Sequence, residues 1–286
     1  MEAYTDFASV YDVFMDDTPY SEWADFLEIL IKKHGISAPS RANSDVGAKE
    51  DLHACKKEEI LKAERDLVLD LGCGTGTLTE LLYQKGYDMI GVDNSEDMLN
   101  IALAKRERTG SEILYLCQDM RNLDLYSTIG TVICVCDSIN YLLEDDEVED
   151  TFALVNNYLY PGGIFVFDFN TVYKYEKVIG DTTIAENRET CSFIWENYYH
   201  EEGRINEYDL TIFAKAGEGD LFRRFTETHF QRGYTLSEMT AFVEKAGMKV
   251  IQILDADTHE SPNECSERIY VVARECKKNR DDESEK

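Results

Sequence analysis

The sequence predicts an α/β fold in which a doubly wound, mainly parallel sheet of seven strands carries a small inserted antiparallel sheet. Apolar strand-like runs alternate with helix-like segments in the first half of the chain, which is typical of a parallel sheet covered by helices. After Asn170 the pattern changes to aromatic and β-branched runs separated by polar turns, which is typical of antiparallel hairpins. With 286 residues, 43% of them hydrophobic, the chain can bury one ordinary core.

The elements of the first half follow from apolar periodicity. A helix is expected over residues 21–34, where apolar residues recur every three or four positions. Residues 36–59 are polar and lose this periodicity, so they are predicted to be an exposed insertion that carries no chemistry. The alternation that follows predicts strands over 67–71, 89–92, 113–117, 132–136 and 164–169, with helices over 78–85, from 95 onward and over 148–159.

The second half is expected to leave the main sheet and then return to it. Strands over 193–199, 205–215 and 221–230 form the inserted sheet, and Thr235 with Glu238 begins a helix with capping-box spacing. Strands over 249–254 and 268–273 complete the main sheet, the last one antiparallel. The expected organisation is a main domain of residues 1–175 and 231–275, an antiparallel lid of 176–230 and a disordered tail of 276–286.

Composition narrows the function. The formal net charge of −28 argues against binding to duplex DNA or other phosphate backbones, and it favours a small-molecule partner, although the excess acid would also serve solubility. There is no apolar run of membrane-span length and no secretory pattern in residues 1–10, so a cytoplasmic protein is expected. The eight cysteines include no C-x-x-C pair, and Cys117, Cys134 and Cys136 are interpreted as reduced core thiols. We expect no metal site, and the oligomeric state is not predicted.

The most informative segment is the apolar run that ends in glycines before a helix. Gly72, Gly74 and Gly76 would let the backbone approach a ligand closely, and the helix that follows offers free N–H groups. A dinucleotide fingerprint would place its third glycine at position 77, which is Thr77. The G-x-G-x-G spacing, with Asp70 before it and Cys73 within it, resembles motif I of the class I S-adenosylmethionine-dependent methyltransferases.

Acidic residues also follow the next two predicted strands. Asp93, followed by Asn94, is placed where a carboxylate can accept both hydroxyls of a ribose. The resemblance implies that Asp119 accepts the adenine amino group and that Met98 and Met120 form apolar walls for the ring. S-adenosylmethionine is therefore the expected cofactor.

The resemblance extends over roughly residues 7–274, to a bacterial branch of the family with an antiparallel lid. It implies that Asp137 and Ser138 lie beside the methionine part of the donor and that Tyr11 helps to cover it. A helix-packing role for Tyr11 is the alternative. The sequence departs from enzymes that methylate base amino groups, because Asp137 is followed by Ser138 and Ile139 rather than by two prolines.

Methyl transfer from a sulfonium is a direct displacement, so the residues that matter most are those that orient the acceptor and remove its proton. The lid supplies candidates: His229, Tyr199 and Arg232 are the predicted catalytic residues, with Trp195 nearby as sheet packing or acceptor contact. In an extended strand Glu227 shares a face with His229, and that face points either to the donor or to solvent.

Three other functions stay open at this stage. A nicotinamide-dependent oxidoreductase shares the sheet, but the glycine spacing and Asp119 count against it. A catalytically silent donor-binding module would keep the same motifs without turnover. An RNA-modifying methyltransferase is disfavoured by the acidic charge and by the missing proline motif. The acceptor atom, whether O, N or C, is not predicted.

Overall fold

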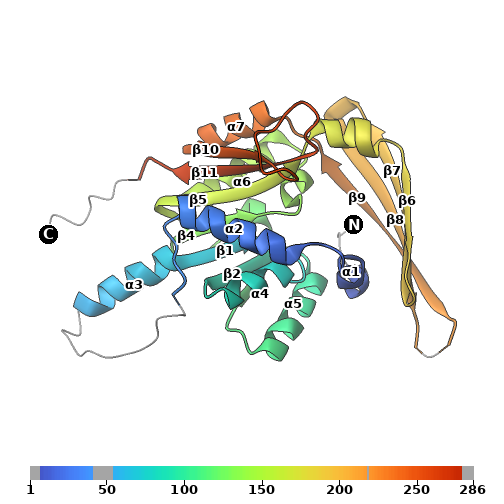
Figure 1. The fold of residues 1–286 in the computed structure, drawn as a ribbon, viewed down its shortest axis with the longest axis horizontal. Coiled ribbons are helices and arrows are strands. Elements are labelled where there is room, and N and C mark those ends of the chain that lie inside the picture. Colours follow the sequence, from blue (N-terminus) through green and yellow to red (C-terminus); the bar gives the residue numbers. More distant parts are fainter. Residues whose placement is uncertain (1–6, 41–53, 218, 279–286) are drawn as a thin grey trace.

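The computed structural model describes residues 7–40, 54–217 and 219–278 (Figure 1). Part of the predicted insertion, residues 41–53, lies outside the described residues, as do residues 279–286 of the predicted tail. Within the described ranges, no helix combines the length and the apolar character needed to cross a membrane.

Seven strands form the main sheet in the order β10-β11-β5-β4-β1-β2-β3. Of these seven strands only β11 runs antiparallel to the rest, which confirms the predicted mainly parallel sheet with an antiparallel last strand. Because β2 and β3 are added on one side of β1 while β4 and β5 are added on the other, the order of strand addition reverses between β1 and β4. The strands are β1 (Leu67–Leu71), β2 (Asp88–Asp93), β3 (Leu114–Cys117), β4 (Ile129–Cys134), β5 (Leu159–Asn170), β10 (Met248–Asp255) and β11 (Arg268–Glu275).

Helices cover both faces of this sheet and bury two apolar cores. Helices α2 and α4 pack on one face, and α6 and α7 pack on the other. The predicted capping box of α7 is present, since Thr235 and Glu238 bond each other's backbone N–H groups. Helices α1 and α3 were not predicted. The helices are α1 (Ala8–Phe14), α2 (Tyr20–His34), α3 (Ala54–Asp66), α4 (Thr77–Gln84), α5 (Glu96–Thr109), α6 (Asp145–Tyr158) and α7 (Leu236–Lys245).

A separate four-stranded antiparallel sheet, in the order β6-β7-β8-β9, is inserted between β5 and α7 and extends away from the main sheet (Figure 1). Its strands are β6 (Thr183–Asn187), β7 (Cys191–His200), β8 (Ile205–Lys215) and β9 (Phe222–Arg232). Sequence analysis missed β6, because its side chains are mostly exposed and show no apolar alternation. We call this sheet the lid sheet.

The first helix joins the two sheets. Val10 of α1 is buried with Cys191 and Phe193 of β7, and the ring of Phe14 meets Phe193 edge-on at 4.8 Å. Among the cysteines, Cys134 is buried as expected, but the expectation for Cys117 is wrong. Cys117 is exposed because it ends β3, the outermost strand of the main sheet.

Phe152 of α6 is fully buried and lies 5.3 Å from Phe165 and 5.0 Å from Phe167, measured between ring centroids. Phe152→Ala should lower the free energy of unfolding by about 3–5 kcal/mol, because it removes a large ring from a packed core. The matched control is Phe230→Ala on the lid sheet, where the ring is 43% exposed, and its cost should be about 1 kcal/mol or less. Urea titration measures both, and equal losses would contradict this account of the core.

Candidate active site

The glycine loop turns sharply at the end of β1. Gly72 has a φ of 79°, and a Cβ at this position would lie 2.6 Å from the hydroxyl oxygen of Ser138. Gly72 follows β1 and Ser138 follows the neighbouring strand β4, so the two chain segments approach closely between these strands. Gly76 has a φ of 73° and is the residue from which α4 begins. Both positions therefore require glycine, one for close approach and one for backbone conformation. The N–H groups of Gly72 and Cys73 both donate to the carbonyl of Val92, which fastens the loop to β2.

Asp93, at the end of β2, is the anchor of the loop. One carboxylate oxygen accepts the N–H of Gly74 at 2.8 Å, and the other accepts the N–H of Ser95 at 2.9 Å. Burial raises the pKa of Asp93, against the lowering effect of these hydrogen bonds. The predicted helix cap is made by Ser95, whose hydroxyl accepts the N–H of Met98. Asp93 therefore holds the glycine loop against the start of α5.

Asp70 lies beneath the loop and is almost fully buried. Its carboxylate accepts the hydroxyl of Thr79 at 2.6 Å. The pKa of Asp70 is raised to about 7, chiefly by burial, with the Thr79 hydrogen bond opposing the change and the neighbouring Asp93 adding to it. Asp70 is therefore poised between its neutral and ionised forms near neutral pH.

These residues surround a cavity of about 390 Å³ at the carboxyl ends of β1 to β4. This volume falls within the roughly 300–1,000 Å³ of small-molecule sites. Most of the predicted donor-binding residues line it: Tyr11, Asp70, Gly72, Cys73, Gly74, Asp93, Asn94, Met98, Asp119, Met120 and Ser138. Gly76 and Asp137 are not among the described residues that line the cavity.

Asp119 lies in the wall of the cavity and is paired with Arg121. The Arg121 Nε lies 3.0 Å from both carboxylate oxygens of Asp119, and the Arg121 backbone N–H donates to one of them. These hydrogen bonds lower the pKa of Asp119. Arg121 also pairs with Glu147 and itself lines the cavity. The acid that was predicted to accept the adenine amino group is therefore already bonded to a guanidinium.

The chain after β4 makes a strained turn beside the glycine loop. Cys136 and Asp137 have φ values of 61° and 54°, a left-handed conformation that is costly for residues other than glycine. Their backbone N–H groups donate to the two carboxylate oxygens of the fully buried Asp168, at 3.1 and 2.8 Å. The Asp137 carboxylate accepts the side-chain N–H of Gln231 from the lid sheet at 2.5 Å. The turn is therefore held from β5 and from the lid sheet at once.

Helix α1 closes the cavity from the N-terminal side. Tyr11 lines the cavity, and the neighbouring Asp12 accepts the hydroxyl of Thr75 at 2.7 Å. The other oxygen of Asp12 lies 2.7 Å from the Lys105 ammonium group. Burial lowers the pKa of Lys105 despite this contact with Asp12. Sequence reasoning placed Tyr11 at the site but missed Asp12, which fastens α1 to the glycine loop.

His229 faces inward, so its predicted strand face points into the protein rather than to solvent. His229 and Glu227 are only 2% and 4% exposed, and Nε2 of the imidazole lies 3.3 Å from a Glu227 oxygen. Nδ1 lies 3.1 Å from the hydroxyl oxygen of Tyr141, a residue of the cavity wall that sequence reasoning did not select. His229 is thus connected to the cavity through Tyr141.

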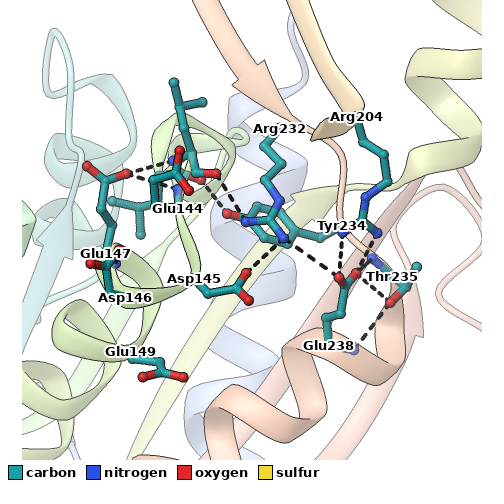
Figure 2. A network of polar contacts seen from close by, with 12 residues as sticks. Glu144, Asp145, Asp146, Glu147, Glu149, Arg204, Arg232, Tyr234, Thr235 and Glu238 are labelled. Atoms are coloured by element: carbon teal, nitrogen blue, oxygen red, sulfur yellow. Dashed lines mark hydrogen bonds and ion pairs between the residues drawn. The ribbon is translucent and has the colours of Figure 1, made fainter. Parts of the chain in front are cut away.

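Arg232 and Tyr199 lie elsewhere. Figure 2 shows the Arg232 guanidinium between Asp145, at 2.8 Å, and Glu238, at 3.7 Å, and it also donates to the carbonyl of Leu143 at 3.0 Å. Burial raises the pKa of Tyr199, with Glu176 adding to the increase. Neither residue is among the described residues of the cavity wall. The geometry of Arg232 favours a structural role, since it joins the lid sheet to the starts of α6 and α7.

A doubly wound sheet with a glycine loop at its reversal point, and with an acid after the next strand, defines a nucleotide-type binding protein. Residues 68–163 match the family model described as "Methyltransferase domain". A protein of Geobacillus sp. (strain WCH70), provisionally described as a methyltransferase, is 34% identical over 271 residues, covering 95% of this chain and 99% of the relative. The chain belongs to the class I, Rossmann-like S-adenosylmethionine-dependent methyltransferases.

Two further relatives are informative. The crystal structure of an S-adenosylmethionine-dependent methyltransferase from Clostridium acetobutylicum ATCC 824 superposes with a TM-score of 0.77 and 26% identity, covering 96% of this chain and all of the other. A dTDP-3-amino-3,4,6-trideoxy-alpha-D-glucopyranose N,N-dimethyltransferase of Streptomyces venezuelae is 27% identical over 190 residues, covering 65% of this chain and 77% of the relative. The methyl donor of this family is S-adenosylmethionine.

The raised pKa of Asp70 predicts that the free energy of unfolding decreases as the pH rises. The unfolded chain ionises this group near pH 4 and the folded chain near pH 7, so stability is lost as the pH rises through that interval. Asp70→Asn should remove this loss. The difference in free energy of unfolding between the variant and the wild type should therefore shift by roughly 2–3 kcal/mol in favour of the variant from pH 5 to pH 8. Urea titrations of both proteins at the two pH values measure the change. A pH-independent difference between them would contradict the assignment.

Proposed function

We propose that the protein transfers a methyl group from S-adenosylmethionine, bound in the cavity at the carboxyl ends of β1 to β4, to a small molecule that enters beneath the lid sheet. The observation that carries the proposal is the cavity itself, which gathers the glycine loop, Asp93 and the methionine pair Met98 and Met120 in one place. When bound, the donor supplies a sulfonium methyl group that is displaced directly by the acceptor.

The residues present fit this donor. A Cβ at Gly74 would meet no atom within 4 Å, so the loop leaves open space here, and the loop lies at the start of α4, where backbone N–H groups favour polar ligand groups. The half-buried carboxylate of Asp93 is oriented by two backbone N–H groups, so its position is set before the ribose hydroxyls arrive. Met98 and Met120 supply apolar surface for an aromatic ring.

The small-molecule acceptor is supported by the position of α1 and by charge. Tyr11 of α1 lines the cavity and α1 packs on the lid sheet, so the two together can shield a small acceptor from water. The formal net charge of −28 disfavours nucleic-acid substrates with a long phosphate backbone. The Streptomyces venezuelae relative is described as acting on an amino sugar, which is consistent with a small acceptor here. An RNA-modifying enzyme is the less favoured alternative.

Asp93→Ala should weaken binding of the demethylated donor, S-adenosylhomocysteine, by about ten- to a hundredfold, since a charged partner of two hydroxyls is lost. Asp93→Asn, which keeps the shape, separates loss of charge from loss of loop structure. Asp88→Ala is the matched control, because Asp88 is exposed at the opposite end of β2. Calorimetry on folded variants measures the affinities. Unchanged affinity in Asp93→Ala would remove Asp93 from the site.

The protein should not bind duplex DNA or generic RNA appreciably at physiological salt, because an acidic surface releases few counterions from a phosphate backbone. Fluorescence anisotropy with labelled duplex and single-stranded oligonucleotides measures this. Micromolar binding that weakens steeply with added salt would count against the small-molecule proposal and in favour of the RNA-modifying alternative.

A further inference from the structure

A buried row of polar groups runs from the cavity wall into the lid sheet. The Tyr141 hydroxyl, at the cavity, lies 3.1 Å from Nδ1 of His229 and 2.7 Å from the hydroxyl of Tyr208. Beyond the imidazole, Nε2 lies 3.3 Å from one oxygen of Glu227, whose other oxygen accepts the N–H of Phe7 at 2.9 Å. The start of α1 and strands β8 and β9 of the lid sheet, which are distant from Tyr141 in sequence, thus contribute to one row of contacts that begins at Tyr141.

The chemistry of these groups indicates which atom donates and which accepts the proton at each contact in the row. The Glu227 carboxylate, whose oxygens can accept a proton or a hydrogen bond, is the group that faces Nε2 at 3.3 Å, which favours the tautomer with the proton on Nε2 when His229 is neutral. Nδ1 is then an acceptor, and the Tyr141 O–H donates to it. The ring of Tyr208 stacks on the imidazole, with centroids 4.9 Å apart and planes within 7°, which fixes the orientation of His229. The arrangement draws the Tyr141 proton away from the cavity.

We propose that Tyr141 is a catalytic residue that takes up the proton of the methyl acceptor, and that His229 and Glu227 are positioning residues that receive and stabilise it. This inference rests on the proposed function. It assigns the acceptor to compounds whose attacking atom carries a hydrogen, namely neutral primary or secondary amines and hydroxyl compounds.

With these residues, every proton and electron pair of the methyl transfer is accounted for. The acceptor atom forms a bond to the methyl carbon, and the carbon–sulfur bond breaks with its electron pair staying on sulfur. The acceptor proton passes to the Tyr141 oxygen as the Tyr141 proton moves to Nδ1 of His229. The sulfonium charge that is lost reappears as an imidazolium beside the Glu227 carboxylate, and water removes that proton after turnover. No further reactant is needed.

The first test does not depend on knowing the acceptor. Histidine is labelled with ¹⁵N, the protein is saturated with S-adenosylhomocysteine, and the His229 signal is assigned by its loss in His229→Gln. At a pH where the imidazole is neutral, we expect the proton on Nε2, and we expect the Nδ1 shift to move in Tyr141→Phe but to stay nearly unchanged in the matched control Tyr208→Phe. A proton on Nδ1, or identical spectra for Tyr141→Phe and wild type, would overturn the proposal.

The second test uses turnover with labelled S-adenosylmethionine and a panel of primary amines, amino sugars, phenols, thioethers and tertiary amines. For an N–H or O–H acceptor, Tyr141→Phe should lower kcat by about 10²–10⁴-fold, the usual contribution of general acid–base catalysis, with KM within threefold. Tyr208→Phe should lose less than tenfold. Methylation of thioethers or tertiary amines alone overturns the proposal. Failure of the wild type to bind S-adenosylhomocysteine contradicts the proposed function instead, and the ¹⁵N spectra of the unliganded protein then decide the arrangement of protons between Tyr141 and His229.

Discussion

The site depends first on the half-buried carboxylate of Asp93. Partial burial of an ionised side chain is costly unless hydrogen bonds compensate it, and here the N–H groups of Gly74 and Ser95 supply them. The same two bonds fix the glycine loop to β2 and to the start of α5. Gly72 then lies close enough to Ser138 that only glycine fits. The position of one carboxylate thus sets the shape of the loop, the mouth of the cavity and its contact with the chain after β4.

A second carboxylate, that of Asp168, holds the turn after β4. Asp168 is fully buried, and burial raises its pKa while Arg268, 3.7 Å away, opposes that change. It binds the backbone of Cys136 and Asp137 in a left-handed conformation that these residues would not adopt unaided. Because Asp137 also bonds Gln231, a movement of the lid sheet would act directly on this turn. The turn after β4, beside the glycine loop, is therefore directly connected to the lid sheet.

The features that the sequence predicted are those that depend on residues close together in the chain. Strands that end in glycine or acid, and the cap at Ser95, can be read from a few neighbouring residues, which is why the order of strands and helices and most of the cavity wall were foreseen. The exposed strand β6 was missed because its partner β7 decides its conformation. Asp12 and Tyr141 were missed for a related reason. Asp12 acts on Thr75, 63 residues away, and Tyr141 acts on His229, 88 residues away. No local pattern marks either contact.

The central claim is that the donor lies along the carboxyl ends of β1 to β4 with its reactive end toward Tyr141. A crystal structure with S-adenosylhomocysteine bound tests this most directly. The account predicts the ribose hydroxyls on Asp93, the adenine between Met98 and Met120, and the sulfur facing the side of the cavity that holds Tyr141. An adenine ring beside Tyr141, or a ligand bound outside this cavity, would contradict it.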